Sequence, residues 1–331
     1  MKNDNRSHII LMTEPTTPLN DADQGGTFFM GELKKMELKQ PLTYEQQIDR
    51  CINYHNLIIS DRNKAKEILK KVNYYRLSAY GIGLKKKDDP EKYVDGVSLE
   101  QIYRIYCFDS KFKNILIHCV EQIEIQLRTQ ISYHMAIEYG AEGYVDRDNF
   151  EIKYTSEGVD IHSRIISDFT KECARQRNIP FVKHHRMKYE GRFPIWVAVE
   201  LFSFGNLASL YDIMTLEDRV AISALYNTKP QRLGSWILML VEVRNICAHY
   251  TRLYNMPLKQ TPYLYSEDKQ YRTGKHNKIF PVLLAIKRML RNNDLWRSTY
   301  AQIEAVIEEY QNDINLSFMG FPRNWKEVLS K

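Results

Sequence analysis

The chain has 331 residues, of which 44% are hydrophobic and 12% aromatic, so it contains enough apolar material for one large core or two modest ones. Charged residues interrupt every apolar run well before the roughly 20 residues that a membrane-spanning helix needs, and we therefore expect a cytoplasmic protein with no membrane partner. The five cysteines lack paired spacing, which argues against a disulfide framework and a zinc site, and the net charge of +6 is mild for this length.

The N-terminal part of the sequence divides into a tail and a helical region. Residues 1–36 contain Thr, Asp, Asn and Gly with little periodicity, which predicts a flexible tail. From Thr43, apolar residues recur at spacings of three and four through residue 59, and a second helical pattern covers 64–80. Because we find neither an internal repeat nor a long strand-like alternation, we predict one all-α domain over 37–331.

A long helix is predicted next. Ser98 and Gln101 have the spacing of a capping box, and apolar residues then follow helical periodicity as far as Gly140. About forty residues exceed the roughly 8 to 20 of an ordinary globular helix. We therefore expect either a bend near residues 109–110 or a helix that forms the central element of the fold.

One polar stripe runs along this helix beside its apolar face. Glu121, Glu124 and Arg128 follow one another at spacings of three and four residues, which places them on the same side of the helix. An exposed Glu124–Arg128 ion pair, worth about 0.3–0.5 kcal/mol, would explain two of them. The alternative that we favour is that all three support Arg244, which is discussed below.

Basic residues are concentrated in two stretches. Residues 171–192 contain seven Lys or Arg against two Glu, and residues 269–291 contain seven and no acid. The phosphate backbone of RNA is the natural partner for such stretches, although a solvated surface is an equally good explanation. The residues that we predict to bind RNA are Lys171, Arg175, Arg177, Lys183, Arg186, Lys188, Arg192, Lys275 and Lys278.

The second half of the chain is predicted to be helical, apart from a turn-rich stretch over 141–160 and an irregular stretch that ends at Pro194. Another helix is predicted to start with Thr228 as its N-cap, because Gln231 follows three residues later, and it cannot extend beyond Pro257. Periodicity predicts further helices over 161–177, 195–211, 216–226, 281–290 and 294–310.

The helix that starts at Thr228 carries the strongest local irregularity. Ile237 and Leu240 on its apolar face are followed by Arg244, with Asn245 and His249 beside it. Burying a guanidinium or an amide without partners costs several kcal/mol, so an inward face interrupted by such groups indicates a site or an interface. We predict that Arg244, Asn245 and His249 are catalytic.

Three other Arg–His pairs have a similar spacing: Arg50/His55, Arg128/His134 and Arg177/His184. His55 falls in line with apolar residues, which predicts a buried core histidine. Pro180 interrupts any helix that would fix the geometry of the third pair. Arg128/His134 lies on one helix and stays open as a second candidate site, although chance explains its spacing and His134 shares an apolar face.

The letters RNICAH at 244–249 match R-N-x-x-x-H, the motif of the HEPN ribonucleases. The chain also resembles the Abi-like (AbiD/AbiF) abortive-infection family of bacterial phage-defence proteins. This resemblance extends over nearly everything after residue 40. It is carried by NYYRLSAY at 73–80, FDSKFKNILIHCVEQIEIQLRTQISYHMA at 108–136, RFPIWVAVELFSFGNLASLY at 192–211, RNICAHYTRLYN at 244–255 and MGFPRNW at 319–325.

The resemblance implies an all-α fold, a HEPN-like helical bundle with additional N- and C-terminal helices. It also implies a homodimer, because in HEPN proteins two copies of the motif meet at an interface and build one composite site. Cys247 and Ala248 are small enough to let two such helices approach closely.

The chemistry expected of such a site needs neither a metal ion nor a cofactor. RNA supplies its own nucleophile, the 2′-OH, so cleavage needs a base for that proton, an acid for the leaving oxygen and a cation for the developing charge. A histidine such as His249 can be base or acid, and the planar fork of Arg244 matches phosphate oxygens. Asn245, one turn before His249, could orient the imidazole or bind a phosphate oxygen.

Three functions follow from these observations. The leading one is an RNA endonuclease with toxin-like activity in abortive infection, which would leave 2′,3′-cyclic phosphate ends and spare DNA. The alternative is a non-catalytic RNA-binding module that holds a structured noncoding RNA or a partner protein. A purely structural interaction protein with a buried Arg and His network is the third.

Overall fold

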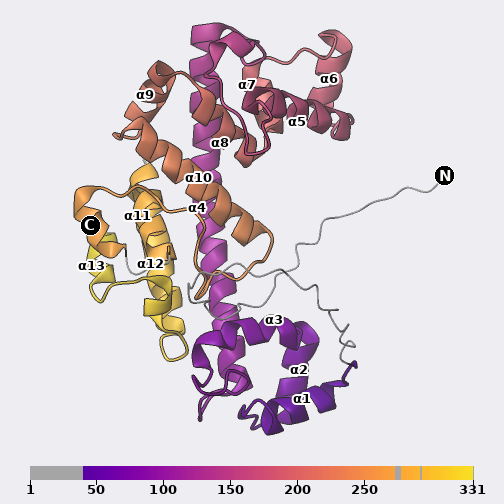
Figure 1. Cartoon of the computed structure of the whole chain (residues 1–331), viewed down its shortest axis with the longest axis vertical. Coiled ribbons are helices and arrows are strands. Elements are labelled where there is room, and N and C mark those ends of the chain that lie inside the picture. Colours follow the sequence, from indigo (N-terminus) through magenta and orange to yellow (C-terminus); the bar gives the residue numbers. More distant parts are fainter. Residues whose placement is uncertain (1–39, 273–276, 291–292, 331) are drawn as a thin grey trace, which may run out of the picture. The chain divides into compact units, whose positions relative to one another are not determined.

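The computed structural model describes residues 40–272, 277–290 and 293–330, and Figure 1 shows their arrangement. The fold is all-α, as predicted, and within these ranges the only β pairing consists of isolated bridges. Residues 42–331 cluster as one compact unit. The tail predicted over 1–36 lies outside the described residues. None of the described helices is both long and apolar enough to cross a membrane.

Helix α4, Leu99–Tyr139, is the central element of this unit. Its 41 residues form one continuous helix, and helices from both halves of the chain pack along it (Figure 1). The Ser98 side chain accepts a hydrogen bond from the backbone nitrogen of Gln101 at 3.0 Å, so the predicted N-cap is confirmed. Gly140, with φ of +76°, ends the helix. The helix continues through residues 109–110 without interruption, where the sequence allowed for a bend.

The N-terminal helices contact the first part of α4. The second helix predicted there, over 64–80, is broken into shorter helices. Val72 adopts an extended conformation, and Asn73 then caps a new helix. Thr43 forms the full capping box of the first helix with Gln46. The elements are α1 Tyr44–Asn53, α2 Arg62–Lys71, α3 Tyr74–Ser78 and the 3₁₀ helix η1 Ala79–Leu84.

His55 is the core histidine that its apolar spacing predicted. It is buried, and its Nδ1 donates to the carbonyl oxygen of Glu91 at 2.8 Å. Its ring lies 5.5 Å from that of Tyr74. The Arg50/His55 spacing is therefore explained by packing.

The middle of the chain departs from the prediction in two places. The stretch predicted as irregular up to Pro194 contains a helix, because Pro180 occupies its first position, where the missing N–H costs nothing. The helix predicted over 195–211 is interrupted before Ser203, which caps a new one. The elements are η2 Arg147–Asn149, α5 Ile161–Arg175, α6 Pro180–Lys188, α7 Ile195–Ala198, η3 Val199–Leu201, α8 Phe204–Ile213 and α9 Leu216–Ala224.

Helix α10, Pro230–Ala248, packs against α4, α8, α9 and α11 (Figure 1). The predicted N-cap is wrong by one residue. Lys229 is the N-cap and its side chain makes no capping hydrogen bond, because Pro230 at the first position presets the helical φ. The remaining elements are η4 Ser266–Tyr271, α11 Ile279–Met289, α12 Asn293–Glu309, η5 Leu316–Met319 and α13 Trp325–Ser330.

Candidate functional site

The candidate catalytic residues lie on the outer side of the C-terminal end of α10. Arg244 is partly exposed, and Asn245 and His249 are exposed, whereas Val243 and Cys247 face the core. The inward placement predicted from the sequence is therefore wrong. The buried face is rotated by about one residue from the predicted one, which keeps the guanidinium and the amide in contact with water.

Helix α10 ends abruptly at this site. The backbone nitrogen of Thr251 donates to Ile246 at 3.0 Å and that of Tyr250 donates to Cys247 at 3.4 Å, which is the pattern of a Schellman motif. Tyr250 has a φ of +56°, a left-handed conformation that costs a non-glycine residue about 1 kcal/mol or more. His249 is thus the C-cap, and the helix does not continue toward Pro257.

The chain that follows His249 is fixed to α4 by a buried carboxylate. Asp109 is fully buried and accepts hydrogen bonds from the backbone nitrogens of Leu253, at 3.0 Å, and Tyr254, at 2.7 Å. It also accepts from the hydroxyl of Tyr80 at 2.8 Å and forms an ion pair with Lys113 at 2.9 Å. Asp109 therefore connects η1, α4 and residues 253–254.

Basic side chains also link the segment after His249 to the helices around it. Lys113 donates to the carbonyl of Thr251 at 2.8 Å, and Arg76 donates to that of Tyr250 at 2.7 Å. The guanidinium of Arg252 donates to the backbone of η1, and burial lowers its pKa. These contacts fix the backbone directly after the candidate acid–base residue.

Glu124 lies between the two arginines of the predicted site. The Arg128 guanidinium donates to the Glu124 carboxylate and to the carbonyl of Val199, so it is held by partners within the chain. The other oxygen of Glu124 lies 3.9 Å from Nε of Arg244. The side chain of Arg244 is 40% exposed against 12% for Glu124. The geometry fits a supporting role for Glu124, and that role stays a prediction.

Two adjoining pockets meet at these residues. They have volumes of about 560 and 570 Å³ and share Arg128, Glu200 and Arg244, and we call the pair the Arg244 groove. One half is lined by residues of α4, including Glu121, and by Ala248 of α10. The other half is lined by residues of α5 and of the segment 201–206. His249 lies one residue beyond the lining.

Glu200 is a groove residue that the sequence did not reveal. It belongs to the short helix η3 and is exposed in both halves of the groove. With Glu121 and Glu124 it gives the α4 half of the groove three acids beside the two arginines, and Asp168 and Glu172 line the other half. No spacing rule connects η3 with α10, because the fold alone brings them together.

The predicted RNA-binding residues are spread over several sites. Lys171 and Arg175 line the Arg244 groove, where they pair with Asp168 at 3.4 Å and Glu172 at 2.6 Å, which offsets part of their charge. Lys278 is partly buried, and burial lowers its pKa. Lys275 lies outside the described residues. Arg177 and Arg186 are exposed. Lys183 and Lys188 line pockets at α6. Arg192 forms an ion pair with Glu142.

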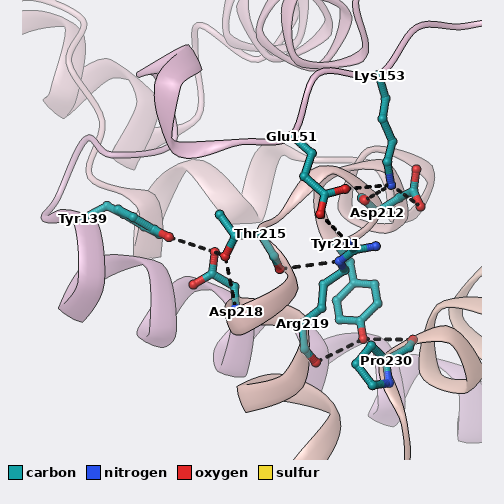
Figure 2. A network of polar contacts seen from close by, with 9 residues as sticks. All are labelled: Tyr139, Glu151, Lys153, Tyr211, Asp212, Thr215, Asp218, Arg219 and Pro230. Atoms are coloured by element: carbon teal, nitrogen blue, oxygen red, sulfur yellow. Dashed lines mark hydrogen bonds and ion pairs between the residues drawn. The ribbon is translucent and has the colours of Figure 1, made fainter.

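The second candidate pair, Arg128/His134, is explained by structural contacts. His134 Nε2 lies 2.7 Å from the Asp218 carboxylate, which also accepts from Tyr139 and Thr215, and Figure 2 shows the latter two contacts. Burial disfavours the charged form of Asp218, but the hydrogen bonds from His134, Thr215 and Tyr139 outweigh it and lower the pKa of this carboxyl. His134 thus joins α4 to α9, and Arg128 is occupied elsewhere.

The cysteines offer no alternative nucleophile at the groove. All five are free thiols. Burial raises the pKa of Cys247, the one nearest to the candidate residues, to about 12, so it stays protonated at neutral pH. Within the described ranges, no three His, Cys, Asp or Glu side chains are grouped so that they could hold a metal ion.

Comparison with known proteins adds one result. The family described as Abi-like protein matches residues 67–255, which is more than half of the chain. The matched segment begins within α2, includes all of α4 and α10, and contains every residue of the Arg244 groove named above. Neither a curated protein nor a solved structure matches the chain.

Proposed function

The chain belongs to the Abi-like protein family, and from this premise we propose that it acts in abortive-infection defence against phage as a metal-independent RNA endonuclease. One observation carries the proposal. Arg244 lines both halves of a groove, is exposed enough to reach a ligand, and lies about 1.4 helical turns before an exposed histidine at the C-cap of the same helix. A cation for phosphate and an acid–base group are the two elements that RNA cleavage requires.

The reaction that we propose uses the 2′-hydroxyl of the RNA. His249 removes its proton, the 2′-oxygen attacks the adjacent phosphorus, and the bond from phosphorus to the 5′-oxygen of the next nucleotide breaks. The products are a 2′,3′-cyclic phosphate and a 5′-hydroxyl. Arg244 stabilises the charge that develops on the phosphate oxygens. The long 3.9 Å contact with Glu124 leaves the Arg244 fork available, because phosphate offers shorter, charge-assisted hydrogen bonds.

The leaving oxygen needs a proton, and one histidine does not easily make both transfers at once. We propose that a second copy of the chain supplies it from its own His249, so that a homodimer forms one composite site. The exposed Ala248 permits close approach of two α10 ends, whereas Cys247, which the sequence suggested as a second small contact residue, faces the core. Asn245 accepts from Arg244 at 3.4 Å and helps to orient its guanidinium.

A second function has its own support in the structure. Lys183 and Lys188 of α6 are exposed, have no ion pair within the described part of the chain and lie outside the Arg244 groove. A surface of this kind binds a phosphate backbone without chemistry. The alternative is therefore a non-catalytic module that holds a structured noncoding RNA.

Replacing Arg244 with lysine tests the proposal directly. We expect cleavage of RNA to fall by about 10²–10³-fold, because lysine keeps the charge but loses the planar fork. RNA affinity should change far less. The matched control is Arg297→Lys, an arginine of α12 that is 78% exposed and pairs with Asp294 of its own helix. Wild-type cleavage by Arg244→Lys would refute the proposed role of Arg244, and RNA binding without cleavage by the wild-type protein would favour the alternative.

Removing metal ions is expected to leave cleavage unchanged, because the proposed nucleophile and acid–base groups belong to the RNA and the protein. Excess EDTA should therefore not slow the reaction. An oligonucleotide with a single 2′-deoxy position at the cleaved linkage should resist cutting there. The measurement is gel analysis of end-labelled RNA with and without the chelator. Loss of activity in EDTA that Mg²⁺ restores would contradict the metal-independent mechanism.

A further inference from the structure

A pocket of about 710 Å³ lies apart from the Arg244 groove. It is formed by α6, the turn after α4 and residues 190–197, and no residue that lines it also lines the groove. Its volume is typical of pockets that enclose a small organic group. Its wall combines aromatic, cationic and carboxylate side chains. We call it the α6 pocket.

Two exposed aromatic side chains line the α6 pocket. Trp196 is 54% exposed, whereas the other three tryptophans of the chain are at most 7% exposed. Tyr189, at the end of α6, is also exposed. In the same lining, the ring of His185 stacks on that of Phe193 with centroids 5.0 Å apart and planes only 15° from parallel. The ring of Tyr189 contacts those of His184 and His185, and the Lys188 ammonium lies 5.4 Å from its centroid. The exposed indole of Trp196 is therefore the ring surface on which a flat group can stack.

The charges around the pocket suit a nucleotide. Lys188 lines it, and Lys183 lines an adjoining hollow of about 560 Å³ that shares Lys188 with it. By contrast, Arg192 in the pocket wall already pairs with Glu142. A left-handed turn, with φ of +54° at Glu190, brings that carboxylate into the lining, where it can accept a hydrogen bond from an exocyclic amino group.

We propose that the α6 pocket binds an unpaired nucleobase of an RNA strand, with Trp196 stacking on the base and Lys183 and Lys188 facing the phosphates beside it. This inference rests on the proposed function in one respect, that RNA is the ligand. An acidic peptide would satisfy the lysines but leave the ring surfaces unused, and so the aromatic lining favours a nucleobase. With this pocket, the protein would recognise single-stranded or looped RNA.

Tryptophan fluorescence of the full-length protein tests this proposal. The probe is an adenosine oligomer of about 12 nucleotides with 2′-O-methyl groups, which the proposed reaction cannot cut. We expect it to quench the wild-type emission. Trp196→Phe should lose the quench yet bind with nearly wild-type affinity, measured by anisotropy of a labelled probe. Trp196→Ala should bind about tenfold more weakly. Tyr263→Ala, which removes another exposed aromatic ring, is the matched control and should behave like the wild type.

Two further ligands and one activity assay separate the outcomes. Quenching by adenosine monophosphate at an affinity equal to that of the oligomer would overturn the proposal in favour of a free-nucleotide site. Displacement of the oligomer by polyglutamate with equal effectiveness would overturn it in favour of a general polyanion surface. Wild-type cleavage of unmodified RNA is measured in parallel. If the wild-type protein cleaves RNA but the Trp196 variants quench and bind like the wild type, the proposed base-binding pocket is refuted and the nuclease proposal stands. If the Trp196 variants change quenching and binding but the wild-type protein does not cleave RNA, the nuclease proposal is refuted and the pocket stands.

Discussion

Replacing His249 with alanine is expected to slow RNA cleavage by about 10²–10⁴-fold while the protein still folds and binds RNA. His249 is exposed at the C-cap of α10, and the structure gives its imidazole no hydrogen bond within the described residues. Its removal therefore leaves no buried group without a partner. The measurement is single-turnover cleavage, together with thermal unfolding followed by circular dichroism.

Imidazole in the buffer supplies the specific control for this variant. A small base can enter the space left by the missing side chain and take over its proton transfer, so it should restore part of the cleavage by His249→Ala and none by Arg244→Lys. Cleavage by His249→Ala at the wild-type rate would contradict the assignment. If the variant unfolds at a much lower temperature, His249 has a structural role that its exposure does not predict.

Replacing Asp109 with alanine is expected to lower the free energy of unfolding by about 3–5 kcal/mol, the usual cost of removing one partner of a buried ion pair. The change leaves the Lys113 ammonium, the backbone nitrogens of residues 253–254 and the hydroxyl of Tyr80 without their acceptor. Urea unfolding measures the loss. Variants that still fold should also cleave more slowly, because the chain after His249 loses its attachment to α4.

An exposed ion pair between α4 and α12 provides the matched control. Lys111 and Glu309 approach to 2.6 Å, but their side chains are 51% and 48% exposed, so Glu309→Ala should cost less than about 1 kcal/mol. A double-mutant cycle between Asp109→Ala and Lys113→Ala then isolates the buried pair. Equal, small losses for the buried and the exposed carboxylate would show that Asp109 does not anchor the segment.

Local signals were sufficient to predict α4 and most of the helices around it, but not every point at which one helix ends and the next begins. The capping residue Ser98 and the terminal Gly140 act within a few residues of the helix ends, and therefore they are readable in the sequence. Pro180 was misread because proline both interrupts a helix and starts one, and the choice depends on the conformation of the residues before it. Ser203 was overlooked within a continuous apolar pattern.

Periodicity could not predict which side of α10 faces the core. This helix packs against four others, so apolar residues occupy several of its sides and periodicity no longer marks one face. The motif residues were found by their chemical type, but their exposure and the proximity of Glu124 to Arg244 required the fold. The role of Asp109 also required the fold, because a sequence does not show which backbone groups a buried carboxylate will meet.

The length of α4 has a consequence for how the site opens. Asp109 and Glu124 are about 22 Å apart along this helix, since each residue adds about 1.5 Å, and one contacts the segment after His249 while the other contacts Arg244. Arg244 and the segment after His249 are thus both attached to the same helix, α4. Residues 250–254 have no helical structure, yet Arg76 of α3 and Asp109 and Lys113 of α4 hold them, so this segment can move away only when those hydrogen bonds break.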